Sequence, residues 1–384
     1  MQAFRKYPYH RYTLERVRAS NLQFERNCRP GTKKDDVDWA ENHKLKESRA
    51  IQSEYWTEAM MSLFICISKL LLLSSWQKSS GQLMVGEEVT VDPELVLAEL
   101  WGNHSEPSYW ATIVKAGGSH EKSLYTVEDE HGTKHQMQRK FLRHRKWHTV
   151  AMIGVTSDRK HDSYATQYFM TEQQKWWEEK YVKTKKEPIT RLHVHSDNAT
   201  HFKSSKSLNF LSRLRQLFLW ILAVTWSFGC GGHGKGAWDG IGAVVKRALR
   251  QDVVDKKVLS DSGVLKTWID VTQHLERRFS SEKWREQHRT YKHTVNEFVI
   301  QGCESVNRPT YEEQFESIFG IQKSFGYIGL ESGSVMQREW DCWCPACFCS
   351  IAGTTDSAYS KFSHLMSRDF FSMVDEKTRK WQNG

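Results

Sequence analysis

Apolar and polar residues are arranged along this chain in two different patterns. Between 149 and 253, apolar runs of strand length alternate with longer segments in which apolar residues recur at helical spacing. This pattern predicts strands at 150–155, 192–195 and 223–228 and helices at 161–181, 205–219 and 239–253. Strands that alternate with helices in this way favour an α/β fold with a mixed sheet flanked by helices.

The second pattern begins at Gln82, where valines alternate with polar residues and short strand signals follow at 110–114 and 124–127. Short strands at this spacing predict a small antiparallel barrel or sandwich over residues 82–147. Since strand–helix alternation resumes after this segment, we expect the barrel to be an insertion. Its pattern resembles that of Tudor and other SH3-like barrels.

Four aromatic residues of the predicted barrel suggest a binding role: Trp101, Tyr109, Trp110 and Tyr125. Aromatic rings can enclose a methylated Lys or Arg, as in a modified histone tail, because the cation is attracted to the ring faces. The more common alternative is that these rings form the core of the barrel.

The flanking segments complete the expected organisation. A short strand signal at 37–41 precedes the barrel, as does an apolar run at 60–73 that predicts a buried strand, although its length also fits a helix. Apolar residues at helical spacing predict an amphipathic helix within 264–300. The expected parts are a basic, turn-rich N-terminal arm (1–34), the first part of the α/β core (35–81), the inserted barrel (82–147), the second part of the core (148–260), and a helical, Cys-rich C-terminal region (261–384).

The charge balance points to a polyanionic partner. Lys and Arg outnumber Asp and Glu by 55 to 46, a net charge of +9 that suits DNA or RNA better than a membrane. The first twenty residues contain no apolar core of a secretory signal, and the apolar runs at 59–73 and 217–228 are too short to span a bilayer. We therefore expect a nuclear or cytoplasmic protein that is not secreted.

A cysteine cluster near the C-terminus suggests a metal site. Cys342 to Cys349 form a C-x-C-x-x-C-x-C pattern, of which Cys344 and Cys347 supply half of a zinc site. Adjacent thiols cannot all reach one tetrahedral ion, so a distant ligand such as Cys303 or His364 would complete it. The alternatives are a redox pair or unreactive buried thiols.

Three carboxylates occupy positions at which α/β proteins carry chemistry. Asp38 lies in the first strand, Asp197 follows the strand at 192–195, and Asp239 begins a helix. Phosphodiester chemistry uses paired divalent ions, and hard Mg²⁺ or Mn²⁺ prefers carboxylate oxygen, so the three acids are candidate catalytic and metal-binding residues. The structural alternative for each is a turn or helix cap.

A glycine-rich loop precedes the last of these acids. Residues 229–235 fit G-x-x-x-x-G-K after a strand and before a helix, as in a nucleotide-binding P-loop, although Gly236 stands where the metal-binding hydroxyl belongs. The backbone N–H groups of such a loop attract phosphate, which makes Gly234, Lys235 and Gly236 candidate phosphate-binding residues.

Several motifs together resemble the RNase H-like DDE transposase and retroviral integrase superfamily. They are Val37-Asp38-Trp39-Ala40-Glu41-Asn42, Ile51-Gln52-Ser53-Glu54-Tyr55-Trp56, Ser157-Asp158, His161-Asp162-Ser163, Ser196-Asp197-Asn198, and the segment 233–242, HGKGAWDGIG. The resemblance covers 35–75 and 149–253.

This resemblance implies a transposon-derived enzyme, oligomeric when active, in which Asp38, Asp197 and Asp239 match the three acids that bind Mg²⁺ or Mn²⁺ to cut and join DNA. The alternative is a catalytically inactive chromatin or nucleic-acid binding protein that uses the barrel and the basic surface. Such inactive copies are common among elements of this kind.

Overall fold

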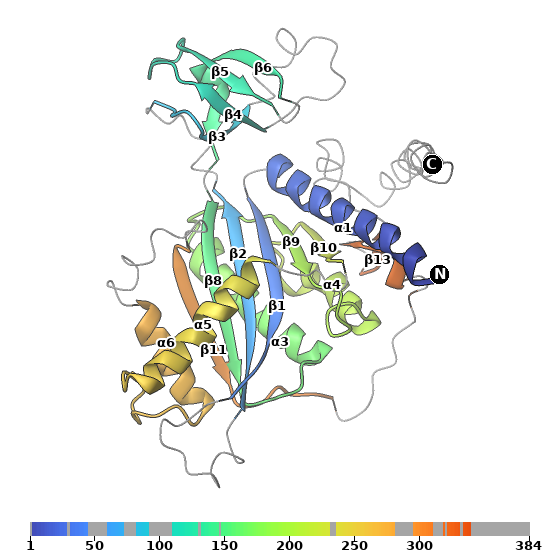
Figure 1. The fold of residues 1–384 in the computed structure, drawn as a ribbon, viewed down its shortest axis with the longest axis vertical. Coiled ribbons are helices and arrows are strands. Elements are labelled where there is room, and N and C mark those ends of the chain that lie inside the picture. Colours follow the sequence, from blue (N-terminus) through green and yellow to red (C-terminus); the bar gives the residue numbers. More distant parts are fainter. Residues whose placement is uncertain are drawn as a thin grey trace.

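The protein has a mixed α/β fold, in which helices flank a large mixed sheet and a smaller sheet stands apart (Figure 1). The structure is a computed structural model, and it describes residues 2–28, 31–44, 60–72, 82–91, 110–129, 132–145, 147–230, 236–280, 295–309, 318, 321–330 and 333–338. No helix in these ranges is long and apolar enough to cross a membrane.

The large sheet has the strand order β11-β8-β2-β1-β9-β10-β12-β13. Its central strands are β8 (Trp147–Thr156), β2 (Met60–Leu71), β1 (Thr32–Lys44), β9 (Arg191–Ser196) and β10 (Ala223–Phe228). β2 is antiparallel to both of its neighbours, whereas β9 and β10 run parallel to β1. The strands β8, β1, β9 and β10 therefore all point toward one edge of the sheet, which we call the carboxyl edge.

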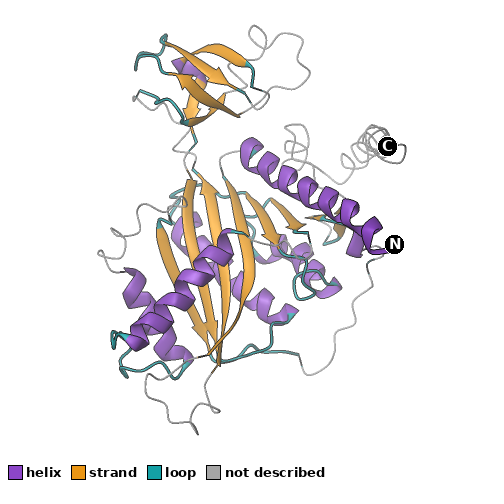
Figure 2. Cartoon of the chain, viewed as in Figure 1, coloured by secondary structure: helices purple, strands orange, loops and turns teal. Residues whose placement is uncertain are grey.

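Helices cover both faces of this sheet (Figure 2). On one face, α3 (Ser163–Trp177), which continues as the π-helix η4 (Glu178–Val182), packs against Phe64 and Cys66 of β2, and α4 (Ser205–Leu217) packs against β10. On the other face, α5 (Ala237–Val254) packs against Leu63 and Ile65, and α6 (Trp268–Ser280) packs against β8. Since β2 is covered on both sides, its sequence is almost continuously apolar. Each such buried side chain contributes roughly 1.5–3 kcal/mol.

The N-terminal segment is mostly a helix that packs on the sheet, and not the turn-rich arm that the sequence predicted. α1 (Gln2–Asn27) lies on the same face as α5, and its Phe24 ring stacks on His193 of β9 with ring centroids 4.0 Å apart. β1 likewise begins at Thr32, earlier than the predicted strand at 37–41. Its four charged residues 33–36 are buried because they pair with one another within β1, and because α1 and α3 supply further partners for Lys34 and Asp35.

The smaller sheet occupies the predicted insertion. Its strands are β3 (Glu88–Val91), β4 (Trp110–Lys115), β5 (Leu124–Glu128), β6 (Lys134–Gln138) and β7 (Leu142–His144), all paired antiparallel in the order β6-β5-β4-β3-β7. The short helix η3 (Arg139–Phe141) links β6 to β7. This sheet has its own apolar core, and it joins the large sheet where β2 ends and β8 begins, at the edge opposite the carboxyl edge (Figure 1).

One of the four aromatics considered for a cage is now placed. Tyr125 is fully buried, and its hydroxyl donates a hydrogen bond to the carbonyl oxygen of Gly118 over 2.8 Å. It therefore belongs to the core of the small sheet. Trp101 and Tyr109, and the side chain of Trp110, lie outside the described residues.

The described part of the C-terminal region contains strands as well as the predicted helix. The helix expected within 264–300 ends at Ser280 as α6, and β11 (Glu297–Cys303) then pairs with β8 at one side of the large sheet. β12 (Gly326–Gly329) and β13 (Val335–Arg338) extend its other side, after the 3₁₀ turn η5 (Ile321–Lys323). The described part of the region predicted as helical therefore contains three strands besides α6, because these short segments become strands by pairing with the rest of the sheet.

Candidate active site

Two of the three predicted acids are neighbours in adjacent parallel strands. The register of β1 against β9 ends at the pair Val37 and Ser196, and the next residues are Asp38 and Asp197. Asp38 Oδ1 accepts a hydrogen bond from the backbone N–H of Trp39 (2.8 Å), and Asp197 Oδ1 accepts one from that of Ala199 (3.0 Å). Both carboxylates therefore lie at the point where β9 ends and β1 continues.

The third acid, Asp239, lies in the first turn of α5, the helix that follows β10. Its Oδ2 accepts a hydrogen bond from the backbone N–H of Gly236 over 2.8 Å, so the side chain does cap the helix, as the structural alternative expected. The residue is exposed. Capping uses one carboxylate oxygen and leaves the charge of Asp239 available to the site.

The charges of the three acids influence the pKa values at this site. Burial and the negative charges of Asp197 and Asp239 raise the pKa of Asp38 to about 7, against the opposing effects of the Trp39 N–H and Lys246. Burial also raises the pKa of Asp197, and Asp239 adds to this shift. A cation would stabilise buried carboxyl groups whose pKa values are raised by burial and by neighbouring negative charges.

The three side chains do not by themselves form a coordination shell. Among the residues that the structure describes, no group of three or more His, Cys, Asp or Glu side chains is arranged to hold a metal ion. The donor set nevertheless suits Mg²⁺ or Mn²⁺, because each acid contributes hard carboxylate oxygen. Within the described ranges, each acid uses a single oxygen in a hydrogen bond.

Other acids quoted in the motifs have a structural role. Arg308 donates hydrogen bonds to both Asp158 and Asp162, the latter from Nε over 2.6 Å. Burial alone would raise the pKa of Asp158, but hydrogen bonds from Arg308 and from the backbone hold it below its ordinary value. Asp162 also caps α3 by accepting the N–H of Ala165. These two acids therefore join loops at the carboxyl edge.

Several predicted site residues lie outside the described residues. They are Gly234 and Lys235 of the glycine-rich loop, and Cys344, Cys347 and His364 of the suggested zinc site. Gly236 is described, and it immediately precedes α5. Cys303 is buried in β11. The roles of these residues in phosphate or zinc binding stay predictions.

The raised pKa of Asp38 predicts an unusual dependence of stability on pH. Between its ordinary value of 3.8 and about 7, the folded protein binds a proton at this carboxyl more tightly than the unfolded chain does. The free energy of unfolding should therefore fall as pH rises through this window. We expect Asp38→Asn to raise the thermal midpoint at pH 8 in EDTA, and to change it little near pH 4.

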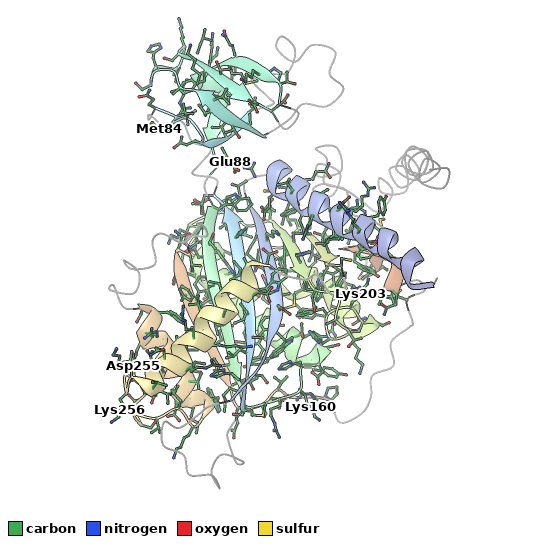
Figure 3. The ribbon with its side chains drawn as sticks, in the orientation of Figure 1. Met84, Glu88, Lys160, Lys203, Asp255 and Lys256 are labelled. Atoms are coloured by element: carbon green, nitrogen blue, oxygen red, sulfur yellow. The ribbon has the colours of Figure 1, made fainter. Side chains whose placement is uncertain are left out.

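Thermal unfolding of both proteins at the two pH values measures this effect. Glu88→Gln, which removes an exposed carboxyl of the small sheet, is the matched control and should leave the midpoint unchanged at both pH values (Figure 3). Equal midpoints for wild type and Asp38→Asn at pH 8 would contradict the placement of Asp38 among like charges.

Comparison with known proteins covers part of this structure. Residues 125–305 match the model of a family described as a domain of unknown function (DUF8701), which is less than half of the chain. No curated protein and no solved structure matches the sequence. The matched segment begins in β5 and ends after β11, so the chain is similar to this family over a region that contains Asp197 and Asp239 and excludes Asp38.

Proposed function

We propose that this protein is a transposon-derived polynucleotidyl transferase or nuclease that acts on DNA with divalent metal ions, built on an RNase H-like core. The strand arrangement supports this proposal. In an RNase H-like core the first strand is central, with two strands paired antiparallel in succession on one side and two parallel strands on the other. β1 has β2 and then β8 on one side and the parallel strands β9 and β10 on the other.

The main observation that supports the proposal is the position of the three acids in this arrangement of strands. Asp38 and Asp197 follow paired positions of β1 and β9, and Asp239 begins the helix after β10. Asp38, Asp197 and Asp239 would hold Mg²⁺ or Mn²⁺, which when bound activates the nucleophile and stabilises the leaving oxygen. The raised pKa values of Asp38 and Asp197, to which burial and nearby carboxylates contribute, support the same assignment.

Basic residues on α5 extend from the acids along one face of the helix. Lys246 is close enough to Asp38 to lower its pKa, and burial, with Lys246 and Arg250, lowers the pKa of His43 to about 4. Arg250 is exposed, and the two cations are roughly 6 Å apart along the helix axis. This face would place cations beside a bound DNA backbone.

We expect DNA binding to weaken with salt, with a logarithmic slope of about −0.9 for each phosphate that is neutralised. Arg250→Met should reduce the steepness of this slope by about one unit, because it removes one phosphate contact. Fluorescence anisotropy over a salt series in EDTA measures the slope. Arg11→Met on the exposed surface of α1 is the control, and an equal change in both variants would show that α5 has no special role.

Cleavage of end-labelled DNA with Mg²⁺ or Mn²⁺ tests the catalytic proposal directly. The alternative is a catalytically inactive chromatin or nucleic-acid binding protein. It is supported by the small sheet, in which β7 returns after η3 to pair with β3, an arrangement typical of SH3-like barrels that include Tudor modules. A wild type that binds DNA but never cuts it would favour this alternative, with RNA or a modified histone tail as further partners to test.

A further inference from the structure

Lys203 is a buried lysine whose ammonium has no ion pair or hydrogen bond among the residues that the structure describes. It lies on the loop between β9 and α4, the loop that also carries Asp197. Its side chain is almost fully buried, with 3% of the residue exposed, and within the described part of the chain its Nζ has no hydrogen-bond partner. Burial lowers the pKa of Lys203 to about 8.

The other buried lysines of the described ranges have carboxylate partners. Lys33 forms an ion pair with Asp35, and Lys34 forms ion pairs with Glu25 and Asp36. A buried ammonium without a carboxylate is costly, and this chain avoids that cost at both of these positions. Lys203 is therefore an exception that needs a reason.

The surroundings of Lys203 are aromatic. Its Nζ lies 5.4 Å from the ring centroid of Phe228, at the end of β10, and 4.8 Å from that of Phe325, which precedes β12. Cation–π contacts compensate only part of the desolvation of an ammonium. A group that destabilises the folded state in this way is typical of a binding site, where a ligand supplies the missing interaction.

The position of Lys203 indicates what that ligand would be. Lys203 directly precedes Ser204, whose hydroxyl caps the N-terminus of α4 by accepting the N–H of Ser207, and helix N-termini attract anions. On the same loop, His201 Nε2 is also buried without a hydrogen-bond partner in the described structure, and a neutral imidazole can donate a hydrogen bond through this nitrogen. An ammonium, a helix N-terminus and an imidazole nitrogen that can donate a hydrogen bond together suit a phosphate group.

We propose that Lys203 and the first turn of α4 bind a phosphate of the polynucleotide strand, beside the phosphate that the three carboxylates would hold through metal. This inference rests on the proposed function for the identity of the strand. Lys203 is then a binding residue that positions the polynucleotide along the carboxyl edge of the sheet. It takes no part in the reaction of the scissile phosphate.

Two variants of Lys203 test this site without metal and without cleavage. Binding of a labelled single-stranded oligonucleotide is measured by anisotropy in EDTA for wild type, Lys203→Met and Lys203→Gln. We expect both variants to bind roughly tenfold more weakly, because a charge-assisted contact is lost, with a salt slope less steep by about 0.7, the value for one phosphate of a single strand. Without nucleic acid, Lys203→Met should unfold at a higher temperature than wild type, since an unpaired buried charge is removed.

Lys256→Met is the matched control, because Lys256 is exposed on the turn after α5 and lies across the core from Lys203 (Figure 3). It should bind as wild type does. Unchanged affinity and slope in both folded Lys203 variants, or an equal loss in Lys256→Met, would overturn the site. Inorganic phosphate that binds wild type, while the variants keep full oligonucleotide affinity, would overturn the assignment to a polynucleotide. A wild type that binds as expected but never cleaves DNA contradicts the proposed chemistry and leaves this binding site intact.

Discussion

Asp197→Asn is expected to abolish metal-dependent cleavage of DNA while the protein stays folded. Asp197 stands beside Asp38 where β9 ends, and its carboxylate would hold a divalent ion on which the reaction depends. Loss of an ion that contributes several kcal/mol to the transition state corresponds to a decrease of roughly 10³-fold or more, since each 1.36 kcal/mol is about tenfold in rate. Cleavage of end-labelled DNA with Mg²⁺ or Mn²⁺ measures it.

DNA binding separates this effect from misfolding. In EDTA, Asp197→Asn should bind DNA as well as wild type or more tightly, because a negative charge near the phosphates is removed. Asp255→Asn, at the other end of α5, is the matched control and should cleave at the wild-type rate (Figure 3). Metal-dependent cleavage that survives in Asp197→Asn would show that the second acid is misassigned.

The second large effect concerns stability. Asp35→Asn is expected to destabilise the fold by about 3–5 kcal/mol, because it leaves Lys33 as an unpaired charge in the centre of the sheet. Both side chains of this ion pair are fully buried. Asp35 also accepts hydrogen bonds from Ser68 (2.7 Å) on β2 and from Gln174 (3.0 Å) on α3. Urea denaturation at neutral pH measures the change in the free energy of unfolding.

An exposed ion pair provides the comparison. Glu15 pairs with Arg11 on the surface of α1, with side chains 62% and 71% exposed, so Glu15→Gln should cost less than about 1 kcal/mol. If Asp35→Asn costs no more than Glu15→Gln, then water reaches Lys33 and the strand is not buried as described. The contrast depends on desolvation, since both variants remove one carboxylate from one ion pair.

The first strand shows where local sequence is a poor guide. The run Lys33-Lys34-Asp35-Asp36 is typical of an exposed segment, and its first half belongs to the turn-rich arm predicted for residues 1–34. In the structure all four residues are buried in β1. Their partners Glu25, Ser68 and Gln174 come from α1, β2 and α3, so no local pattern could have predicted their burial.

The candidate site could likewise be predicted only in part from the local sequence. The sequence predicted Asp38, Asp197 and Asp239 as a set of candidate acids, but the closeness of Asp38 and Asp197 depends on the pairing of β1 with β9. Sequence reasoning missed Lys246 as a neighbour of Asp38, although its spacing from Asp239 along one helix was a usable signal. Lys203 carried no signal, because one lysine in a polar loop resembles any other.

The sequence by itself determined those helices and strands in which apolar residues recur at a regular spacing. The strands β2, β8, β9 and β10 and the helices α3, α4 and α5 all lie within a few residues of their predicted positions, because apolar periodicity records which side of an element faces a core. Only the tertiary structure decided the strand state of β11, β12 and β13, the burial of the charges in β1 and the gathering of the acids. Each of these depends on hydrogen bonds or charges contributed by residues distant in sequence, and a local pattern contains no record of such partners.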